Sequence, residues 1–359
     1  MMNGKALSLS ADFVRVLKAA KRAWQAPVRV AASSELSNDP TIYYLAPDYQ
    51  KPSGGIRVMY RHVDLLNQAG MRAFVLHQKP RFRCNWFEND TRITDIQSTT
   101  VRRGDLLVVS ELNVDLLAKL PQGVRYVIFN QNSHLTWLRN GDSSSSAYMA
   151  GPDRAGVLTV SSHNQEVLRF AFPDCRIDRV HLSIDPQMFY PGTDARPRRI
   201  AYMPRRGRED AEQVLAILKA RGALAGWEIA ALDGLPHHRI AGELRRTRIF
   251  LAFTGQEGFG LPAAEAMACG CYVVGNHGFG GAEFFHPEYS TAVPTGDVLA
   301  FARAVQDVLA REAGDATWCS ERGKRASTAI LSTYGEEQER RDVVQIFSEF
   351  LNVPARMVA

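Results

Sequence analysis

The chain has 359 residues, which is too long for one ordinary hydrophobic core and predicts two domains. Apolar residues make up 45% of it and charged residues 23%, a balance that excludes a disordered or fibrous protein. The net charge of +5 suits a phosphate-bearing ligand or an anionic membrane surface.

Several further classes of protein are excluded by what the sequence lacks. No apolar run reaches the roughly 18 residues that a membrane-spanning helix needs. The first residues show no signal-peptide pattern, so we expect the chain in the cytoplasm. The five cysteines are scattered without paired spacing, which excludes a disulfide framework and a zinc site. The basic residues are dispersed without a nucleic-acid-binding motif, so we expect no nucleic-acid partner.

Residues 1–40 precede the first predicted domain as a helical extension. Between Phe13 and Trp24, apolar residues recur at helical spacing, and basic residues occupy much of the remaining surface. We therefore predict a helix over residues 11–24 that docks either on the protein's own N-terminal domain or on an anionic membrane surface. A polar stretch over residues 32–40 leads into the first strand.

Residues 41–188 show the alternation of strands and helices that is typical of a Rossmann-like domain. The turn Pro52-Ser53-Gly54-Gly55 opens a helix whose apolar residues recur on one face. A polar loop over residues 139–154 is expected to be mobile. Apolar strands are predicted near residues 41–46, 73–76, 105–110, 125–130 and 157–161. Short apolar strands separated by helices predict a parallel sheet covered on both faces.

A second alternating series occupies residues 189–335. Proline-rich polar sequence over residues 185–199 predicts the linker between the two domains. Strands are predicted near residues 199–203, 228–232, 248–253 and 272–274, and helices near residues 209–221, 262–269, 297–311 and 317–331. A last helix over residues 336–351 lies within a closing segment, residues 336–359. The pattern predicts two nucleotide-binding-type α/β domains in tandem.

The most informative segment is residues 253–270. It predicts a strand, a glycine-rich turn and a helix with Pro262 at its first position. Gly258 and Gly260 let the backbone approach a ligand closely, and the free amides of the helix start can bind phosphate. Because ligands of open α/β sheets bind at the carboxyl ends of parallel strands, the segment predicts a phosphate-bearing ligand.

Two carboxylates lie on either side of this turn. We expect Glu257 in the loop before the helix and Glu265 about one turn inside it. A carboxylate accepts two hydrogen bonds from a vicinal diol, so the pair suits the ribose and the hexose of a nucleotide sugar. Taken alone, the same pair also fits a structural role, in which Glu265 favours the helix start electrostatically.

Residues 253–297, which end at Thr295-Gly296-Asp297, resemble the signature of family 4 glycosyltransferases. Those are retaining enzymes of the GT-B fold, whose two signature glutamates are separated by seven residues, as here. The resemblance implies an α/β protein with two Rossmann-like domains facing across a cleft, and a last helix that returns to the N-terminal domain. By the same resemblance, Glu265 would hold the ribose and Glu257 the donor sugar.

The resemblance also assigns the phosphate contacts. The amides of Phe259, Gly260 and Leu261 would hold the distal phosphate, and Gly54 and Gly55 would face the donor phosphates across the cleft.

The family places Arg and Lys on the diphosphate after the first strand of the second domain. This chain has Arg205, Arg206 and Arg208 there and no lysine, which leaves open which arginine serves. A solvated basic loop is the alternative for these residues.

Histidines are less specific signals. His134 follows a predicted middle strand, where family members often place a histidine in the cleft, so it is a candidate for contacting the sugar or the acceptor. The pair His237-His238 lies between predicted elements and is expected at the surface. No Asp-x-Asp pair occurs, so we expect no metal ion, with Arg205, Arg206 and the helix start stabilising the leaving diphosphate.

The resemblance implies a glycosyltransferase that moves a sugar from a nucleotide-diphosphate sugar to a saccharide or lipid-linked saccharide acceptor with retention, in polysaccharide or cell-surface glycan synthesis. The nucleotide sugar is a co-substrate, and no cofactor is expected. The alternatives are a 2-epimerase or an inverting transferase of the same fold, and a non-catalytic nucleotide-binding protein. A nicotinamide-dependent dehydrogenase is disfavoured because residues 52–55 lack the Gly-x-Gly-x-x-Gly pattern. The base, the sugar, the acceptor, the linkage and the oligomeric state stay open.

Overall fold

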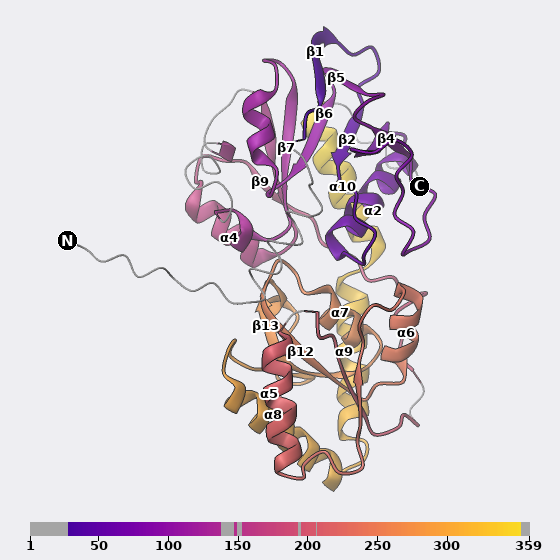
Figure 1. Ribbon diagram of the computed structural model, residues 1–359, viewed down its shortest axis with the longest axis vertical. Helices are drawn as coiled ribbons and strands as arrows, with labels where there is room; N and C mark the ends of the chain where they lie inside the picture. Colours follow the sequence, from indigo (N-terminus) through magenta and orange to yellow (C-terminus); the bar gives the residue numbers. More distant parts are fainter. Residues whose placement is uncertain (1–27, 138–146, 149–152, 193–194, 206, 353–359) are drawn as a thin grey trace, which may run out of the picture.

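The computed structural model of the chain describes residues 28–137, 147–148, 153–192, 195–205 and 207–352. They form two lobes stacked along the long axis of the molecule (Figure 1). The helix predicted over residues 11–24 lies outside the described residues. Among the helices described, none is both long and apolar enough to cross a membrane.

The upper lobe contains a seven-stranded sheet in the order β4-β3-β2-β6-β7-β8-β9, and every pair of neighbours in it is parallel. The strands are β2 (Ile42–Leu45), β3 (Ala73–His77), β4 (Ile93–Asp95), β6 (Leu106–Ser110), β7 (Arg125–Asn130), β8 (Arg154–Thr159) and β9 (Ile177–Arg179). The central strand β6 is buried over its whole length, because helices or loops cover both faces of a parallel sheet. The main helices of the upper lobe are α2 (Gly54–Gln68) and α4 (Ser162–Ala171).

The upper lobe differs from the prediction in its short strands β4 and β9, which the sequence did not predict, and in one further part. The polar stretch expected to lead into the first strand contains β1 (Ala31–Leu36), which pairs in parallel with β5 (Thr100–Arg103) as a separate two-stranded sheet. Most of β1 is exposed. Backbone hydrogen bonds hold this two-stranded sheet more than side-chain burial does. The sequence of β1 therefore shows no apolar alternation.

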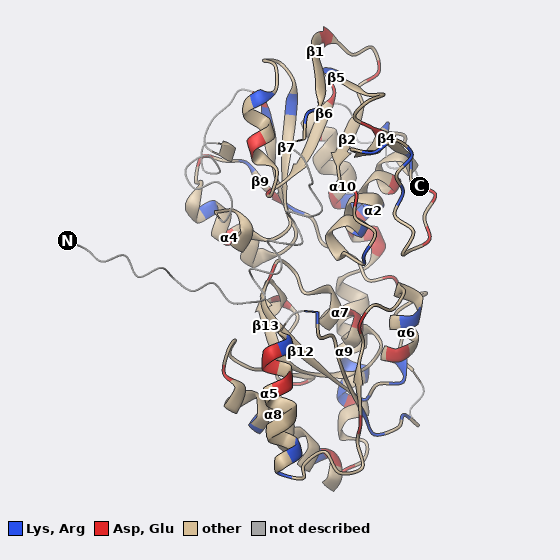
Figure 2. Ribbon diagram, in the orientation of Figure 1, with Lys and Arg blue, Asp and Glu red and all other residues tan. Residues whose placement is uncertain are grey.

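The lower lobe contains a five-stranded parallel sheet in the order β11-β10-β12-β13-β14. The strands are β10 (Arg199–Tyr202), β11 (Glu228–Ala231), β12 (Ile249–Glu257), β13 (Tyr272–Phe279) and β14 (Ser290–Ala292), and the helices are α5 (Arg208–Ala220), α6 (His237–Arg245), α7 (Leu261–Ala268), α8 (Val298–Gly314) and α9 (Trp318–Thr333). The sequence did not predict α6. The strands of both sheets carry few charged residues, which lie mainly on helices and loops (Figure 2).

The last helix, α10 (Glu336–Leu351), leaves the lower lobe and lies beside α2 in the upper lobe (Figure 1). The ring of Phe347 is fully buried, with its centroid 5.7 Å from that of Tyr44 on β2. Near the start of α10, the buried carboxylate of Glu339 pairs with Arg61 of α2 at 3.0 Å and accepts a hydrogen bond from the backbone N–H of Ser183. The end of the chain therefore completes the core of the lobe in which the chain begins.

We expect Phe347→Ala to lower the free energy of unfolding by roughly 3–5 kcal/mol, because it leaves a cavity between α10 and the upper sheet. The matched control is Phe170→Ala on α4, whose side chain is 92% exposed and whose loss is expected to change stability by less than about 0.5 kcal/mol. Urea denaturation followed by circular dichroism measures both. Equal effects in the two variants would mean that α10 adds nothing to the upper core.

Candidate active site

The glycine-rich turn of the lower lobe lies between the end of β12 and the start of α7. Gly260 is the N-cap of α7 and has a φ of 97°, in the left-handed region that favours glycine. The side chain of Phe259 is buried, with its ring centroid 5.2 Å from that of Phe284 and from that of Tyr334. This packing anchors the turn and leaves its backbone directed to the boundary between the lobes.

Glu257 is the last residue of β12 and pairs with Phe279 of β13, after a shift in register. The prediction that it lies in a loop is therefore wrong. The sequence indicated β12 by its apolar run, but the pairing of β12 with β13 continues past the end of that run to Glu257. Glu257 and Glu265 lie before and after the turn, as the sequence predicted.

The two lobes approach each other closely at Gly258. A Cβ atom at this position would overlap the carbonyl oxygen of Gln131 in the upper lobe, so only glycine fits. At Gly54, the first residue of α2, a Cβ would lie 2.9 Å from Cδ1 of Leu261 at the start of α7. The fold thus brings Gly54 against the helix start of the lower lobe, whereas Gly55 packs against the side chain of Gln131 in its own lobe.

One of the arginines after β10, Arg205, lies at the same boundary. Arg205 donates a hydrogen bond from Nη1 to the carbonyl oxygen of Pro52, 2.6 Å away in the upper lobe. Arg208 pairs instead with Asp233 at 3.1 Å, within the lower lobe. Arg206 lies outside the described residues. Of the two described arginines, Arg205 is the one seen to bridge the lobes.

The carboxylate of Glu265 is held from both lobes. Its side chain is 7% exposed, and its Oε1 accepts from Nη2 of Arg57 on α2 at 2.7 Å and from Nε2 of His237 on α6 at 3.2 Å. Arg57 also donates from Nη1 to Nδ1 of His237, at 2.9 Å. Because a guanidinium can only donate, Nδ1 is the acceptor and the ring proton is on Nε2.

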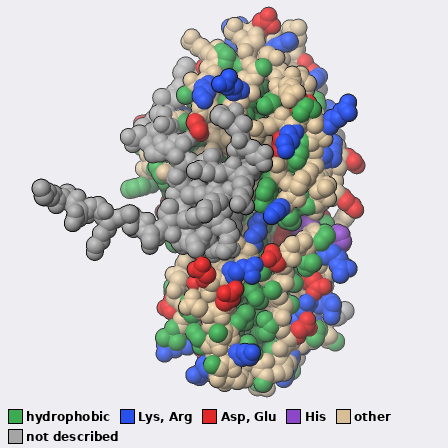
Figure 3. Space-filling model, viewed as in Figure 1, with side chains coloured by type: hydrophobic (Ala, Val, Ile, Leu, Met, Phe, Trp, Pro, Cys, Tyr) green, Lys and Arg blue, Asp and Glu red, His purple; other side chains and the backbone are tan. Residues whose placement is uncertain are grey.

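The prediction for His237 is wrong. Its side chain is 17% exposed rather than at the surface, whereas His238 beside it is exposed as expected. Burial lowers the pKa of His237 to about 4. The negative charge of Glu265 opposes this shift, and the positive charge of Arg57 adds to it. The ring is therefore neutral at neutral pH. Figure 3 shows histidine and basic side chains where the two lobes meet.

A cavity of about 250 Å³ lies beside this group. Side chains from both lobes line it, among them Arg57, Trp86, His237 and Glu265. Oε2 of Glu265 has no hydrogen-bond partner among the described residues, which leaves one carboxylate oxygen for a ligand.

His134 belongs to a second group at the boundary. It lies in the short 3₁₀ helix η2 (Ser133–Leu135), with its ring centroid 5.4 Å from that of His163 on α4 and 5.2 Å from that of Phe279. Nε2 of His134 and of His163 are buried without a hydrogen-bond partner in the described parts of the chain. Burial, and next the nearby His163, lower the pKa of His134. Two buried imidazole rings with unused polar atoms suit hydroxyl groups of a ligand.

Glu111 is a site residue that the sequence did not reveal. It follows β6 directly and is buried, and its Oε1 accepts from the backbone N–H of Asn132 at 3.1 Å. The side chain of Asn132 in turn accepts from the backbone N–H of His134 and donates to the carbonyl oxygen of Gln256, each at 3.1 Å. Burial raises the pKa of Glu111 to about 7. The one available signal was an acid directly after a strand that is apolar except for its last residue, Ser110.

Comparisons with known proteins agree with this architecture. Residues 216–326 match the family model described as glycosyl transferases group 1. No curated protein sequence matches the chain. Among solved structures, the sucrose-phosphate synthase of Thermosynechococcus elongatus superposes with a TM-score of 0.68 at 14% identity, over 87% of this chain and 99% of that one.

Two other solved structures are similar. Anabaena HepE, in complex with UDP and glucose, has a TM-score of 0.63 at 13% identity over 86% of this chain and 99% of that chain. The lipopolysaccharide outer core galactosyltransferase WaaB has a TM-score of 0.59 at 10% identity, over the same shares of the two chains. At these identities the likeness is one of fold: the chain has the GT-B fold, two Rossmann-like domains facing across a cleft, as the resemblance implied.

We expect Glu111→Gln to raise the melting temperature at pH 8 and to change it little at pH 4.5. The pKa of Glu111 is about 7 in the folded protein and near 4.5 in the unfolded chain, so the folded state binds the extra proton. The stability that this proton gives to the folded state is complete below pH 4.5 and is lost as the pH rises through 7. An amide keeps an acceptor for Asn132 without a buried charge.

The measurement is thermal unfolding of both proteins from pH 4.5 to 8.5. Glu321→Gln, on the exposed part of α9, is the control and should give a constant difference from the wild type. A difference for Glu111→Gln that does not vary with pH would show that this carboxyl does not titrate near neutrality.

Proposed function

We propose that the chain is a glycosyltransferase that moves a sugar from a nucleotide-diphosphate sugar to a saccharide or lipid-linked saccharide acceptor with retention, in polysaccharide or cell-surface glycan synthesis. One observation carries the proposal. The start of α7 lies between two carboxylates, Glu257 and Glu265; Gly54 of the upper lobe meets this helix start, and Arg205 of the lower lobe reaches the upper lobe at Pro52, two residues before Gly54. A helix start with converging basic groups suits a diphosphate, and flanking carboxylates suit the sugars attached at either end.

The ribose end of the donor is assigned to Glu265. Arg57 and His237 both bind its Oε1 and so fix the plane of the carboxylate, while Oε2 can accept from a ribose hydroxyl. The cavity beside it gives the nucleoside room. The backbone amides of Phe259, Gly260 and Leu261 then hold the distal phosphate, with Arg205 as the cationic contact.

The sugar end is assigned to Glu257 and His134. The unused Nε2 atoms of His134 and His163 can bind sugar hydroxyls, and Glu257 stabilises the sugar while it carries positive charge. In the transfer step, the bond from the anomeric carbon to the diphosphate oxygen breaks, and the acceptor oxygen bonds to that carbon from the same face. The acceptor's proton passes to the leaving phosphate. Arg205 and the helix start stabilise the charge on the diphosphate, so the step requires neither a metal ion nor a cofactor.

The acceptor is assigned to the upper lobe. Contacts between the lobes, such as that of Arg205 with Pro52, support a closed state that excludes water from the donor. The proposal places the enzyme in the cytoplasm, and a membrane contact through residues 11–24 would suit a lipid-linked acceptor.

We expect the two glutamates to fail differently. Glu265→Gln replaces a charged acceptor of the ribose hydroxyls. It should therefore weaken the binding of the donor and of the free nucleoside diphosphate alike, by roughly 10-fold or more. Glu257→Gln changes only the sugar end, so diphosphate affinity should persist while turnover falls. Calorimetric titration with UDP, GDP, dTDP and ADP, followed by transfer assays with the matching sugars, measures both effects.

Glu321→Gln on α9 is the matched control and should alter neither quantity. Losses that are equal in Glu257→Gln and Glu265→Gln and follow their melting temperatures would refute the site assignment. A normal diphosphate affinity in Glu265→Gln would refute its ribose contact alone.

We expect Arg205→Ala to weaken the binding of the nucleoside diphosphate by roughly 10- to 100-fold, because the substitution removes a charge-assisted contact of about 1.5–3 kcal/mol. Binding of the bare nucleoside should be nearly unchanged. The control is Arg208→Ala, whose guanidinium pairs with Asp233. The same titrations decide the matter, and if Arg208→Ala rather than Arg205→Ala loses affinity, the diphosphate contact belongs to Arg208.

A further inference from the structure

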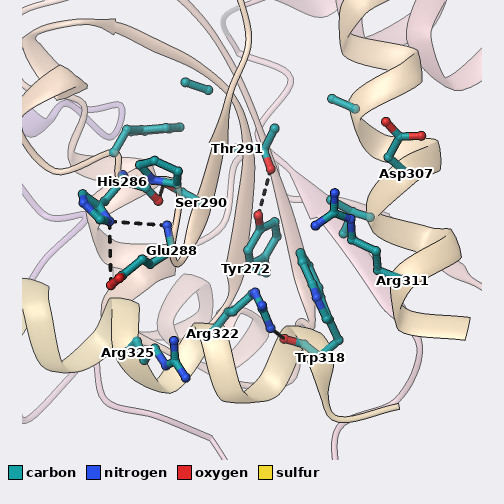
Figure 4. Close-up of a pocket in the computed structure, with 15 residues that line it drawn as sticks. Tyr272, His286, Glu288, Ser290, Thr291, Asp307, Arg311, Trp318, Arg322 and Arg325 are labelled. Carbon is teal, nitrogen blue, oxygen red and sulfur yellow. Dashed lines mark hydrogen bonds and ion pairs between the residues drawn. The ribbon is translucent and has the colours of Figure 1, made fainter. Parts of the chain in front are cut away.

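A second and larger hollow, of about 570 Å³, lies on the outer side of the lower lobe. Residues between Tyr272 and Arg325 form it, on β13, β14, α8, α9 and the loop before β14, and the upper lobe contributes none of them. Figure 4 shows its side chains arranged around an open centre. The hollow is therefore separate from the candidate active site.

Three arginines face this hollow: Arg311 from α8, and Arg322 and Arg325 from α9 (Figure 4). The guanidinium carbons of Arg322 and Arg311 lie 4.1 Å and 5.4 Å from the centre of the Trp318 ring. A guanidinium stacked on an aromatic ring keeps its in-plane N–H groups available for an anion, apart here from Nη1 of Arg322, which donates to the carbonyl oxygen of Trp318 at 3.4 Å. In the described parts of the chain, none of the three arginines forms an ion pair with a carboxylate.

The remaining wall is suited to hydroxyl groups. Tyr272 and Thr291 contribute hydroxyls that are hydrogen-bonded to each other at 2.8 Å. The carboxylate of Asp307 lines the hollow without an ion-pair partner in the described structure. Oε2 of Glu288 lies 3.9 Å from Nδ1 of His286, which accepts a hydrogen bond from the backbone N–H of Glu288 at 3.3 Å. Carboxylates and hydroxyls beside an arginine cluster fit a ligand that carries both an anionic group and several hydroxyls.

We propose that this hollow is a second binding site, for an acidic saccharide, in which Arg311, Arg322 and Arg325 hold the anionic group and Asp307 and Thr291 bind ring hydroxyls. The anionic group is a phosphate ester or a carboxylate, and both make the same contacts with a guanidinium. The site goes beyond the proposed transfer reaction and does not depend on it.

The test is calorimetric titration of the full chain with glucose 6-phosphate, glucuronate, glucose and inorganic phosphate. The first two probes distinguish a phosphate ester from a carboxylate. We expect at least one of them to bind at least 10-fold more tightly than both glucose and inorganic phosphate. We expect Arg322→Gln to raise the Kd of that probe at least 10-fold. We expect Asp307→Asn to reduce the factor by which that probe binds more tightly than inorganic phosphate.

Two control variants locate the binding. Arg303→Gln, an exposed position of α8 outside the hollow, should leave the Kd unchanged. Arg205→Ala, at the boundary between the lobes, should leave it unchanged too. Melting temperatures show whether each variant is folded. The proposal is overturned if no acidic saccharide is preferred, if a folded Arg322→Gln binds like the wild type, or if Arg205→Ala abolishes binding.

Discussion

The carboxylate of Glu265 lies where the two lobes meet, and neither lobe satisfies it alone. A buried carboxylate is costly unless it is paired and hydrogen-bonded, and here the upper lobe supplies Arg57 while the lower lobe supplies His237. Separating the lobes would leave both the guanidinium and the carboxylate without their partner. A second carboxylate, Glu283, joins the lobes in the same way, because it accepts from the backbone N–H of Ser162 at 2.9 Å and pairs with Arg179 at 2.7 Å. The relative position of the lobes is thus set by charge pairing around a glycine backbone.

The electrostatics of the boundary follow from burial. His237 and His134 both have a lowered pKa, so positive charge there at neutral pH comes from arginines such as Arg57, Arg179 and Arg205 and from the start of α7. These charges do not change between pH 5 and 8. Glu111 lies behind this boundary, and its pKa of about 7 falls within that range. Its ionisation would act on the backbone around Asn132 rather than on the charged groups at the start of α7.

The sequence predicted the elements with strong local signals. The apolar runs of β6 and β7 and the glycine-rich start of α7 were found close to their observed positions, because each follows from neighbouring residues. Short edge strands such as β14 carry only three residues and were missed. In the candidate site, the placement of Glu257 and Glu265 before and after the turn depends on one segment and was predicted. The site was missed where it depends on two segments: Arg57 and His237 are 180 positions apart, and only the docking of the lobes makes them neighbours.

The return of α10 to the upper lobe also constrains how the chain can fold during synthesis. The first sheet is complete once β9 has been made, yet Tyr44 still lacks the ring of Phe347 that covers it. That ring is added only after the whole lower lobe has left the ribosome. At about 5–20 residues per second, the upper lobe waits roughly 10–30 seconds with an apolar surface exposed. The folding of the first half of this protein is therefore coupled to the synthesis of its last helix, and truncation near the C-terminus would expose the N-terminal lobe to aggregation.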